Sequence, residues 1–159
     1  MHYFYRAFAS ASTEEERDDR WRRIERLADA QPGDFLAWCH DPPKPGSTGH
    51  VLLIAEAPAL EENVRDDVAK TPGGGGVPAK GRLWRLVVID STSSPHGQDT
   101  RKADESGVGR GTMWFEADEA GRPRGYRWGR AGGTTHIEPL VMGRARSSPG
   151  SVPPPSKAK

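Results

Sequence analysis

Glycine and proline divide this chain into short segments, and that division limits the folds it can adopt. The 159 residues include 19 glycines and 14 prolines, and only 34% of the residues are hydrophobic. The apolar runs between them are short and end at clusters of Gly, Pro, Asp or Ser, a pattern typical of strands. The pattern predicts strands over 35–39, 50–57 and 82–91, a hairpin formed by 112–115 and 125–128, and a last strand over 137–142.

One segment departs from this pattern and predicts a helix over residues 13–29. Thr13 and Glu16 have the spacing of a capping box, in which each side chain bonds the backbone N–H of the other residue. Apolar residues recur along one narrow helical stripe, and the arginines between residues 17 and 26 alternate with acids and are expected to face solvent. One helix followed by strands predicts the α+β class with an antiparallel sheet.

The length suits one domain, which we expect to span residues 1–146. Within it, residues 58–81 form a long insertion around a run of glycines. Residues 1–12 are expected to be the end of a longer N-terminal region, because their aromatic side chains need something to pack against. Residues 147–159 are rich in Ser, Pro and Lys and are expected to be a disordered tail.

Charge and cysteine content exclude several classes of protein. The 23 basic and 22 acidic residues give a net charge of +1, whereas a nucleic-acid binder needs a basic excess, so no nucleic-acid partner is expected. A single cysteine excludes an internal disulfide framework and a four-cysteine zinc site. No apolar run is long enough to span a membrane. The compartment stays open: secreted or cell envelope if a signal segment lies upstream of Met1, and otherwise cytoplasmic.

His50 is the strongest candidate for a chemical role. It begins the second predicted strand, where His50, Leu52 and Ile54 share one face. A histidine at a strand end can reach the rim of a cleft, and histidine ordinarily exchanges protons near neutral pH. From the spacing alone, a structural histidine that is hydrogen-bonded to a loop is the favoured interpretation.

Asp90 is the second candidate. It ends the apolar run 86–89 and opens a Ser-rich turn. An Asp at this place either starts the turn or accepts the N–H of an imidazole and so fixes the tautomer of the ring, and the two interpretations have about equal weight. His96, further into the same loop, is an alternative group for orienting His50.

Other residues carry weaker signals. Cys39 lies at the end of a predicted strand, and a nucleophilic thiol needs a cation or a helix N-terminus beside it, so we expect an inert core residue. The histidines and aspartates match no known metal-ligand spacing, so neither a metal nor another cofactor is expected. The glycine-rich stretches 73–81 and 107–111 match no phosphate or dinucleotide fingerprint and are expected to be loops.

The turn and strand at 32–38, the strand at 49–54 and the strand that ends at Asp90 together resemble the NlpC-type cysteine peptidases, which are papain-like. The resemblance implies a papain-like fold in which a thiolate attacks a peptide or amide bond, often in peptidoglycan. It implies that His50 moves the proton and that Asp90 orients His50. The cysteine of that family precedes these strands at the start of a helix, and residues 1–31 contain no cysteine. The resemblance therefore predicts an NlpC-like domain that is truncated at its N-terminus.

Two main interpretations follow, from different classes of protein. In the first, the chain is an incomplete or inactive cysteine hydrolase, with His50 and Asp90 as its catalytic residues and a peptide or peptidoglycan-like substrate. In the second, it is a non-catalytic β-rich module that binds a peptide or glycan in an aromatic cleft. A structural domain without a pocket is the simplest alternative. The distance between the side chains of His50 and Asp90 distinguishes the first interpretation from the other two. Only a catalytic pair requires these two side chains to be in contact.

Overall fold

The computed structural model describes residues 2–11, 13, 20–44, 47–61 and 82–146. Within these ranges the chain forms one α-helix, one 3-10 turn and a nine-stranded sheet, so the protein is mostly β. The elements are α1 (His2–Ser10), β1 (Trp21–Ile24), η1 (Leu27–Asp29), β2 (Phe35–Lys44), β3 (Ser47–Ile54), β4 (Ala59–Leu60), β5 (Arg82–Thr92), β6 (Gly107–Ala117), β7 (Pro123–Arg127), β8 (His136–Ile137) and β9 (Leu140–Ala145).

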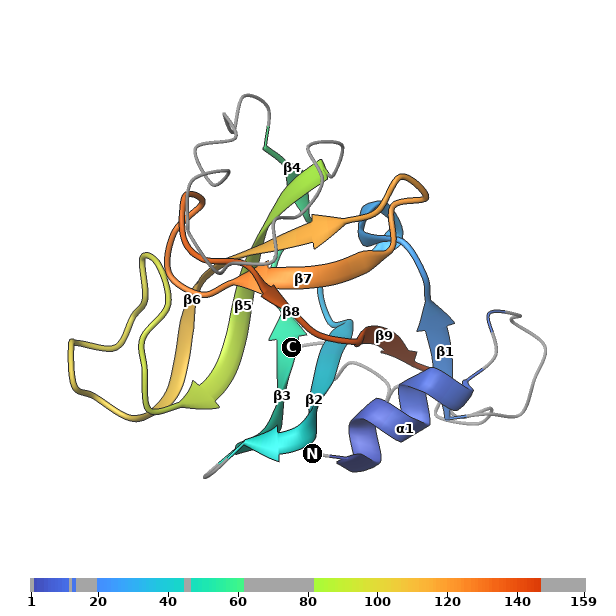
Figure 1. The fold of residues 1–159 in the computed structure, drawn as a ribbon, viewed down its shortest axis with the longest axis horizontal. Helices are drawn as coiled ribbons and strands as arrows, with labels where there is room; N and C mark the ends of the chain where they lie inside the picture. Colours follow the sequence, from blue (N-terminus) through green and yellow to red (C-terminus); the bar gives the residue numbers. More distant parts are fainter. Residues whose placement is uncertain (1, 12, 14–19, 45–46, 62–81, 147–159) are drawn as a thin grey trace, which may run out of the picture.

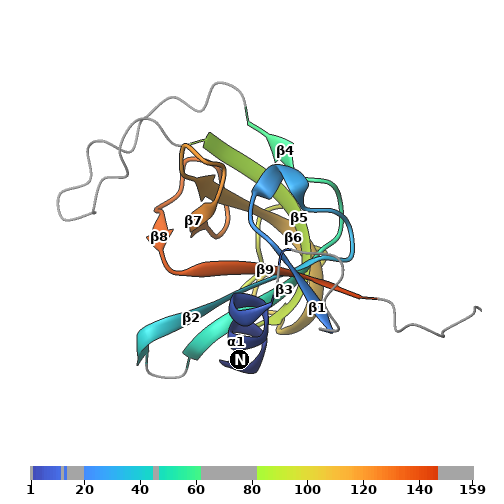
Figure 2. The ribbon, with the colours of Figure 1, turned by 90° about the vertical axis from the view of Figure 1, so that its right-hand side faces the viewer.

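The strands form one antiparallel sheet in the order β1-β9-β2-β3-β5-β6-β7-β8, with β4 paired to β5. The sheet is strongly curved, and β7 and β8 turn back toward β9 (Figures 1 and 2). Strands from both ends of the sheet contribute to a single core on its inner face. That core includes Leu36 of β2, Leu52 of β3, Leu86 of β5 and Met142 of β9.

Helix α1 packs on the outer face of the sheet, against β1, β2 and β9 (Figure 1). Phe8 is fully buried there and meets Trp21 edge-on, with ring centroids 4.8 Å apart. Phe4 stacks on Phe35 at 6.2 Å. Gly143 of β9 makes room for the helix, because a Cβ at that position would overlap the Phe8 ring. Phe4 and Phe8 of this segment therefore pack against the sheet, whereas Tyr3 is 65% exposed.

Two predictions about the fold are wrong. The α+β, papain-like class is contradicted, because the described residues contain a single α-helix and a nine-stranded antiparallel sheet. The helix predicted over 13–29 is also wrong in its described part, where Trp21–Ile24 is a strand and Leu27–Asp29 is a 3-10 turn. Pairing of β1 with β9, near the other end of the described chain, outweighs the local helical periodicity.

The predicted strands are present, with different ends. They correspond to β2, β3, β5, the β6–β7 hairpin and β9, and residues 107–111, predicted as a loop, open β6 instead. β2 continues past its expected stop, through two prolines, to Lys44. Its register with β3 shifts between Cys39 and Lys44, so the prolines lie where the regular ladder is already interrupted.

Some predictions fall outside the described residues. The tail at 147–159 and most of the insertion at 58–81 lie there, and the described part of that insertion contains β4, which pairs with β5. In the described part of the chain, no helix has the length and apolar character needed to span a membrane.

Candidate functional site

His50 projects from β3 toward the inner face of the sheet. It lies directly opposite Trp38 of β2, and Leu52 and Ile54, two and four residues further along β3, belong to the core. Alternation along a strand therefore places His50 on the same face, as the sequence predicts. The His50 side chain is 14% exposed, so it lies at the margin of the core.

Asp90 lies on the neighbouring strand β5 and meets His50. Leu86 and Val88 of β5 are buried in the core, and Asp90 continues their alternation onto the inner face. Its carboxylate has no exposed surface, and its Oδ2 lies 2.5 Å from His50 Nε2. The structure thus brings together the two residues that the sequence named as a catalytic pair, and their catalytic role stays a prediction.

His96 reaches the same carboxylate oxygen. Its Nε2 lies 2.7 Å from Asp90 Oδ2, and its side chain is fully buried. The sequence named His96 as an alternative to Asp90 for orienting His50. In the structure both rings hydrogen-bond to the same oxygen of the Asp90 carboxylate, so His96 holds Asp90 in place and does not contact His50 through a hydrogen bond.

Asp99 and Arg101 complete the cluster, and the sequence analysis missed both. Arg101 forms a fork on Asp99, with Nε–Oδ1 at 2.9 Å and Nη2–Oδ2 at 2.6 Å. Its Nη2 also donates to Asp90 Oδ1 at 3.2 Å, and its Nη1 donates to the Gly107 carbonyl at 2.8 Å. The backbone N–H of His96 donates to Asp99 Oδ2 at 2.8 Å. These bonds fold the loop after β5 inward over the sheet.

Two glycines of β6 leave the space that the loop side chains fill. Gly109 lies directly opposite Asp90, and a Cβ at Gly109 would lie 2.7 Å from Arg101 Cδ. A Cβ at Gly111 would lie 2.8 Å from the Cβ of His96 and 2.7 Å from Asp99 Oδ2. Glycine inside a strand often marks the close approach of another segment. The alternation of glycines at 107, 109 and 111 is therefore the sequence signal from which the inward-folded loop could have been found.

The hydrogen bonds assign the protons of the two rings. A carboxylate only accepts, so both imidazoles carry a hydrogen on Nε2. Nδ1 of His96 is buried and has no hydrogen-bond partner among the described residues. Nδ1 of His50 has no hydrogen bond to a described residue. The His50 side chain is 14% exposed, whereas that of His96 is fully buried, so His50 is the histidine of this cluster that a ligand could reach.

The cluster has an excess of negative charge when both rings are neutral, because Asp90 and Asp99 face a single arginine. Burial on its own would raise the pKa of the Asp90 carboxyl, but the hydrogen bonds from His50 and His96 lower it well below its usual range. The side-chain hydrogen bond from Arg101 likewise lowers the pKa of Asp99. Both carboxylates stay ionised, and a proton on His50 would balance the charge.

His50, Asp90 and His96 are also the described residues best placed to hold a metal ion, with ligand atoms within 4.8 Å of one another. The N···O distances of 2.5 Å and 2.7 Å are hydrogen-bond lengths. Two ligands bonded at about 2.1 Å to one metal would be about 3 Å apart at a right angle. Arg101 occupies the other carboxylate oxygen. The distances therefore favour a hydrogen-bonded cluster over a metal centre.

Cys39 takes no part in the cluster. It pairs with Gly49 rather than with His50, so its side chain points to the opposite face of the sheet. The thiol is buried, and this burial raises its pKa, which disfavours the reactive thiolate. The expectation of a buried core thiol is confirmed.

Aromatic rings surround the two imidazoles. The Trp38 ring centroid lies 5.1 Å from that of His50, and Trp128 meets His50 edge-on at 5.6 Å. Trp128 also contacts His96 at 4.2 Å and donates its indole N–H to the Ser94 carbonyl at 3.3 Å. Apolar walls of this kind lower the local dielectric constant and strengthen the hydrogen bonds of the cluster.

Tyr126 lies beside this aromatic wall, with its ring 4.4 Å from that of Trp38. Burial, reinforced by the negative charge of Glu138, raises the pKa of Tyr126 to about 12. We therefore expect one of the three tyrosines of the chain to ionise only near pH 12 when tyrosinate absorbance is followed during an alkaline titration. Because folding favours the neutral phenol, its contribution to stability is present below the unfolded pKa of about 10 and is lost as the pH rises toward 12.

The control for this titration is Tyr126→Phe, which should remove the late step and leave the remaining absorbance change in place. Glu138→Gln should move the late step to lower pH, because it removes the second cause of the shift. Far-UV circular dichroism has to show that the chain is still folded over the range. Complete ionisation of all three tyrosines near pH 10 in a folded chain would contradict the burial of Tyr126.

Comparison with family models, with curated proteins and with solved structures finds no match for this chain. A function for this chain therefore has to be inferred from its own geometry and chemistry.

Proposed function

We propose that the chain carries a general acid–base site in which His50 transfers the proton and Asp90 orients His50. The observation that carries the proposal is the 2.5 Å hydrogen bond between His50 Nε2 and the fully buried carboxylate of Asp90. A carboxylate in this position fixes the tautomer of the ring and stabilises the imidazolium once it forms. Nδ1 of His50 would take a proton from an attacking group and return it to a leaving group.

Water is the nucleophile in this proposal. Cys39 lies on the opposite face of the sheet, and the fold is not papain-like, so the position of a thiol cannot be carried over from that family. The sequence analysis expects an incomplete or inactive cysteine hydrolase, because no thiol lies where that family carries its nucleophile. In the present proposal water takes the place of that thiol, so the chain is expected to be active. The proposed substrate keeps the class that the sequence resemblance implies, a peptide or amide bond, with cell-wall peptides as one source.

The test uses hydrolysis of alanine p-nitroanilide, a small amide, and of p-nitrophenyl acetate, an activated ester. His50→Gln should lower kcat/KM by about 10²–10⁴-fold, the usual contribution of a general base. Glutamine keeps a side-chain N–H that can still donate to Asp90, so the variant should fold. His136→Gln is the matched control, because His136 is exposed and lies outside the cluster.

Equal rates for the wild type and for His50→Gln would refute the acid–base role. Loss of turnover after treatment with iodoacetamide would assign the nucleophile to Cys39 instead of water. Binding of a peptide or glycan without any turnover would support the alternative of a non-catalytic binding module with an aromatic cleft.

A further inference from the structure

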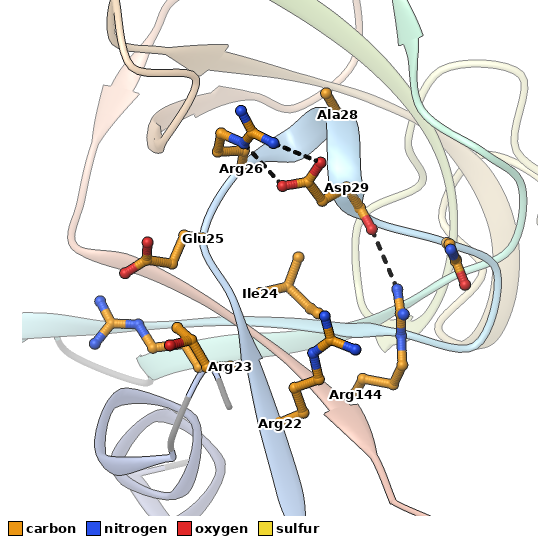
Figure 3. A pocket seen from close by; sticks show the side chains of 10 residues that line it. Arg22, Arg23, Ile24, Glu25, Arg26, Ala28, Asp29 and Arg144 are labelled. Atoms are coloured by element: carbon orange, nitrogen blue, oxygen red, sulfur yellow. Dashed lines mark hydrogen bonds and ion pairs between the residues drawn. The ribbon is translucent and has the colours of Figure 1, made fainter. Parts of the chain in front are cut away.

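Two arginines in the pocket where β1, η1 and β9 meet are already bound within the protein (Figure 3). Arg26 forms a fork on the Asp29 carboxylate at 2.8 Å and 3.1 Å. Arg144 donates to the Asp29 carbonyl at 3.2 Å and to both oxygens of the buried Asp34, at 2.7 Å and 2.8 Å. The hydrogen-bond donors of both guanidinium groups are therefore occupied by this chain's own oxygens.

A different arrangement is found beside the acid–base site, where His40 and Glu138 form a second histidine–carboxylate pair. Nδ1 of His40 lies 2.8 Å from Glu138 Oε1, and the two side chains are only 8% and 11% exposed. A carboxylate only accepts hydrogen bonds, so Nδ1 of His40 carries the hydrogen. Nε2 of His40 has no hydrogen bond to a described residue. His40 is thus held through one ring nitrogen, as His50 is held by Asp90.

The two histidines lie on the same inner face of the sheet. Trp38 of β2 lies directly opposite Leu140 of β9, and both pack on the core of that face. His40 is two residues beyond Trp38, so alternation along β2 places it on that face, and its bond to Glu138, two residues before Leu140, agrees with this placement. Trp38 also lies directly opposite His50. His40 and His50 are therefore diagonal neighbours, about 7–8 Å apart.

This spacing suits an acid and a base that act on one bond. In inverting glycosidases, where a water and the scissile bond lie between the two groups, the acid and the base are about 6.5–9.5 Å apart. Thr48, two residues before His50 on β3, is exposed, so the strand emerges into solvent at this end. A ligand that enters there would approach both rings.

We propose that His40 is the general acid of this site and gives the proton to the leaving group. The inference rests on the proposed function and changes one step of it, since the leaving group receives its proton from His40 instead of His50. Water adds to the carbonyl carbon of the amide, and a proton of that water passes to Nδ1 of His50. The C–N bond then breaks, its electron pair stays on the nitrogen, and the nitrogen takes the proton from Nε2 of His40. One amide and one water give one acid and one amine, and passage of the proton from His50 to His40 through water restores both rings.

The charge of Glu138 supports this role. A general acid needs a proton on Nε2 of His40 while the Nδ1 hydrogen is bonded to Glu138, so the ring has to be an imidazolium. The negative charge of Glu138, which also acts on Tyr126, stabilises that form. His50 then begins the reaction neutral and His40 begins it charged, so that each histidine has a single task.

The test compares the amide and the ester substrates in His40→Gln, a variant that keeps an N–H for Glu138. Breaking the C–N bond of alanine p-nitroanilide requires a proton on the leaving nitrogen, whereas p-nitrophenolate leaves p-nitrophenyl acetate as a stable anion. His40→Gln should therefore lower kcat/KM for the amide by about 10²-fold and change that for the ester by less than about twofold. His50→Gln should lower both, because the base acts on water in each reaction. The ratio of the amide rate to the ester rate within one variant does not depend on the fraction of folded protein.

Glu138→Gln is the conservative variant, because the glutamine oxygen still accepts the His40 N–H while the charge is lost. It should lower the amide rate less than His40→Gln does and leave the ester rate in place. His136→Gln, which changes an exposed histidine outside both pairs, should leave both rates unchanged.

An equal loss on both substrates in His40→Gln, or no loss on either, would overturn the role of His40 and leave the proposed function standing. No effect of His50→Gln on either substrate would refute the proposed function itself. Absence of turnover by the wild type would overturn both.

Discussion

Asp90→Asn is expected to lower the free energy of unfolding by about 3–5 kcal/mol, the range for breaking a buried ion pair. Asparagine keeps the shape of the side chain but lacks the negative charge to which His50, His96 and Arg101 all hydrogen-bond. One of its terminal groups becomes an N–H₂ that faces other donors. The measurement is urea unfolding followed by circular dichroism, at neutral pH.

Asp104→Asn is the matched control for this substitution. Asp104 is exposed and has a φ of 67°, a conformation that asparagine also tolerates, so the change should stay within about 0.5 kcal/mol. The difference between the wild type and Asp90→Asn should shrink as the pH falls. Because the native pKa of Asp90 is lowered, its contribution is present above the unfolded pKa of about 3.9 and is lost on acidification below it. A difference that does not change between pH 7 and pH 2 would contradict the assigned hydrogen bonds.

Gly49→Ala is expected to cost about 3–5 kcal/mol, the sum of backbone strain and overpacking. Gly49 has a φ of 134°, which a residue with a Cβ rarely adopts. A Cβ there would overlap the Trp38 carbonyl oxygen and lie 2.7 Å from the Cα of Cys39. These are backbone atoms of the paired strand β2, so relief requires β2 and β3 to separate. Urea unfolding measures the loss, and His50, the next residue, should lose its alignment with Asp90.

Gly33→Ala separates the two causes of that loss. Gly33 also has a positive φ, 94°, but a Cβ there would meet nothing within 4 Å. Only the strain should remain, at about 1–2 kcal/mol. Equal destabilisation by Gly33→Ala and Gly49→Ala would show that the close approach of β2 and β3 at Gly49 is not a constraint.

The strands could be predicted because their signal is local. Residues 86–89 are apolar and β-branched or Leu, and His50, Leu52 and Ile54 alternate with the residues of the other face, so both segments are identified without their partners. β1 could not be predicted in this way. Its partner, β9, lies at the far end of the described chain, and the spacing of Trp21 and Ile24 fits one face of a helix as well as it fits two faces of a strand.

The candidate site could be predicted in part. His50 and Asp90 each stand at the end of an apolar run, and the resemblance suggested that they meet. Asp99 and Arg101 could not be identified as members of the site, because the sequence of a polar loop does not show which of its charged side chains point inward. The signal lies in the neighbouring strand β6, where the absence of a Cβ at Gly109 and Gly111 leaves the space that the loop side chains occupy.

The inward-folded loop also has a consequence for how the protein reaches its native state. Asp90 bonds to His96 six residues away and to Arg101 eleven residues away, but to His50 forty residues away. Closing short loops costs less entropy than closing long ones, so the β5–β6 segment can assemble its charged network early. His50 joins only when β3 docks beside β5, a non-local pairing of the kind that limits folding rates. His50 is therefore expected to be the last member of the cluster to reach its place, and a partly folded chain would hold Asp90, His96 and Arg101 together without His50.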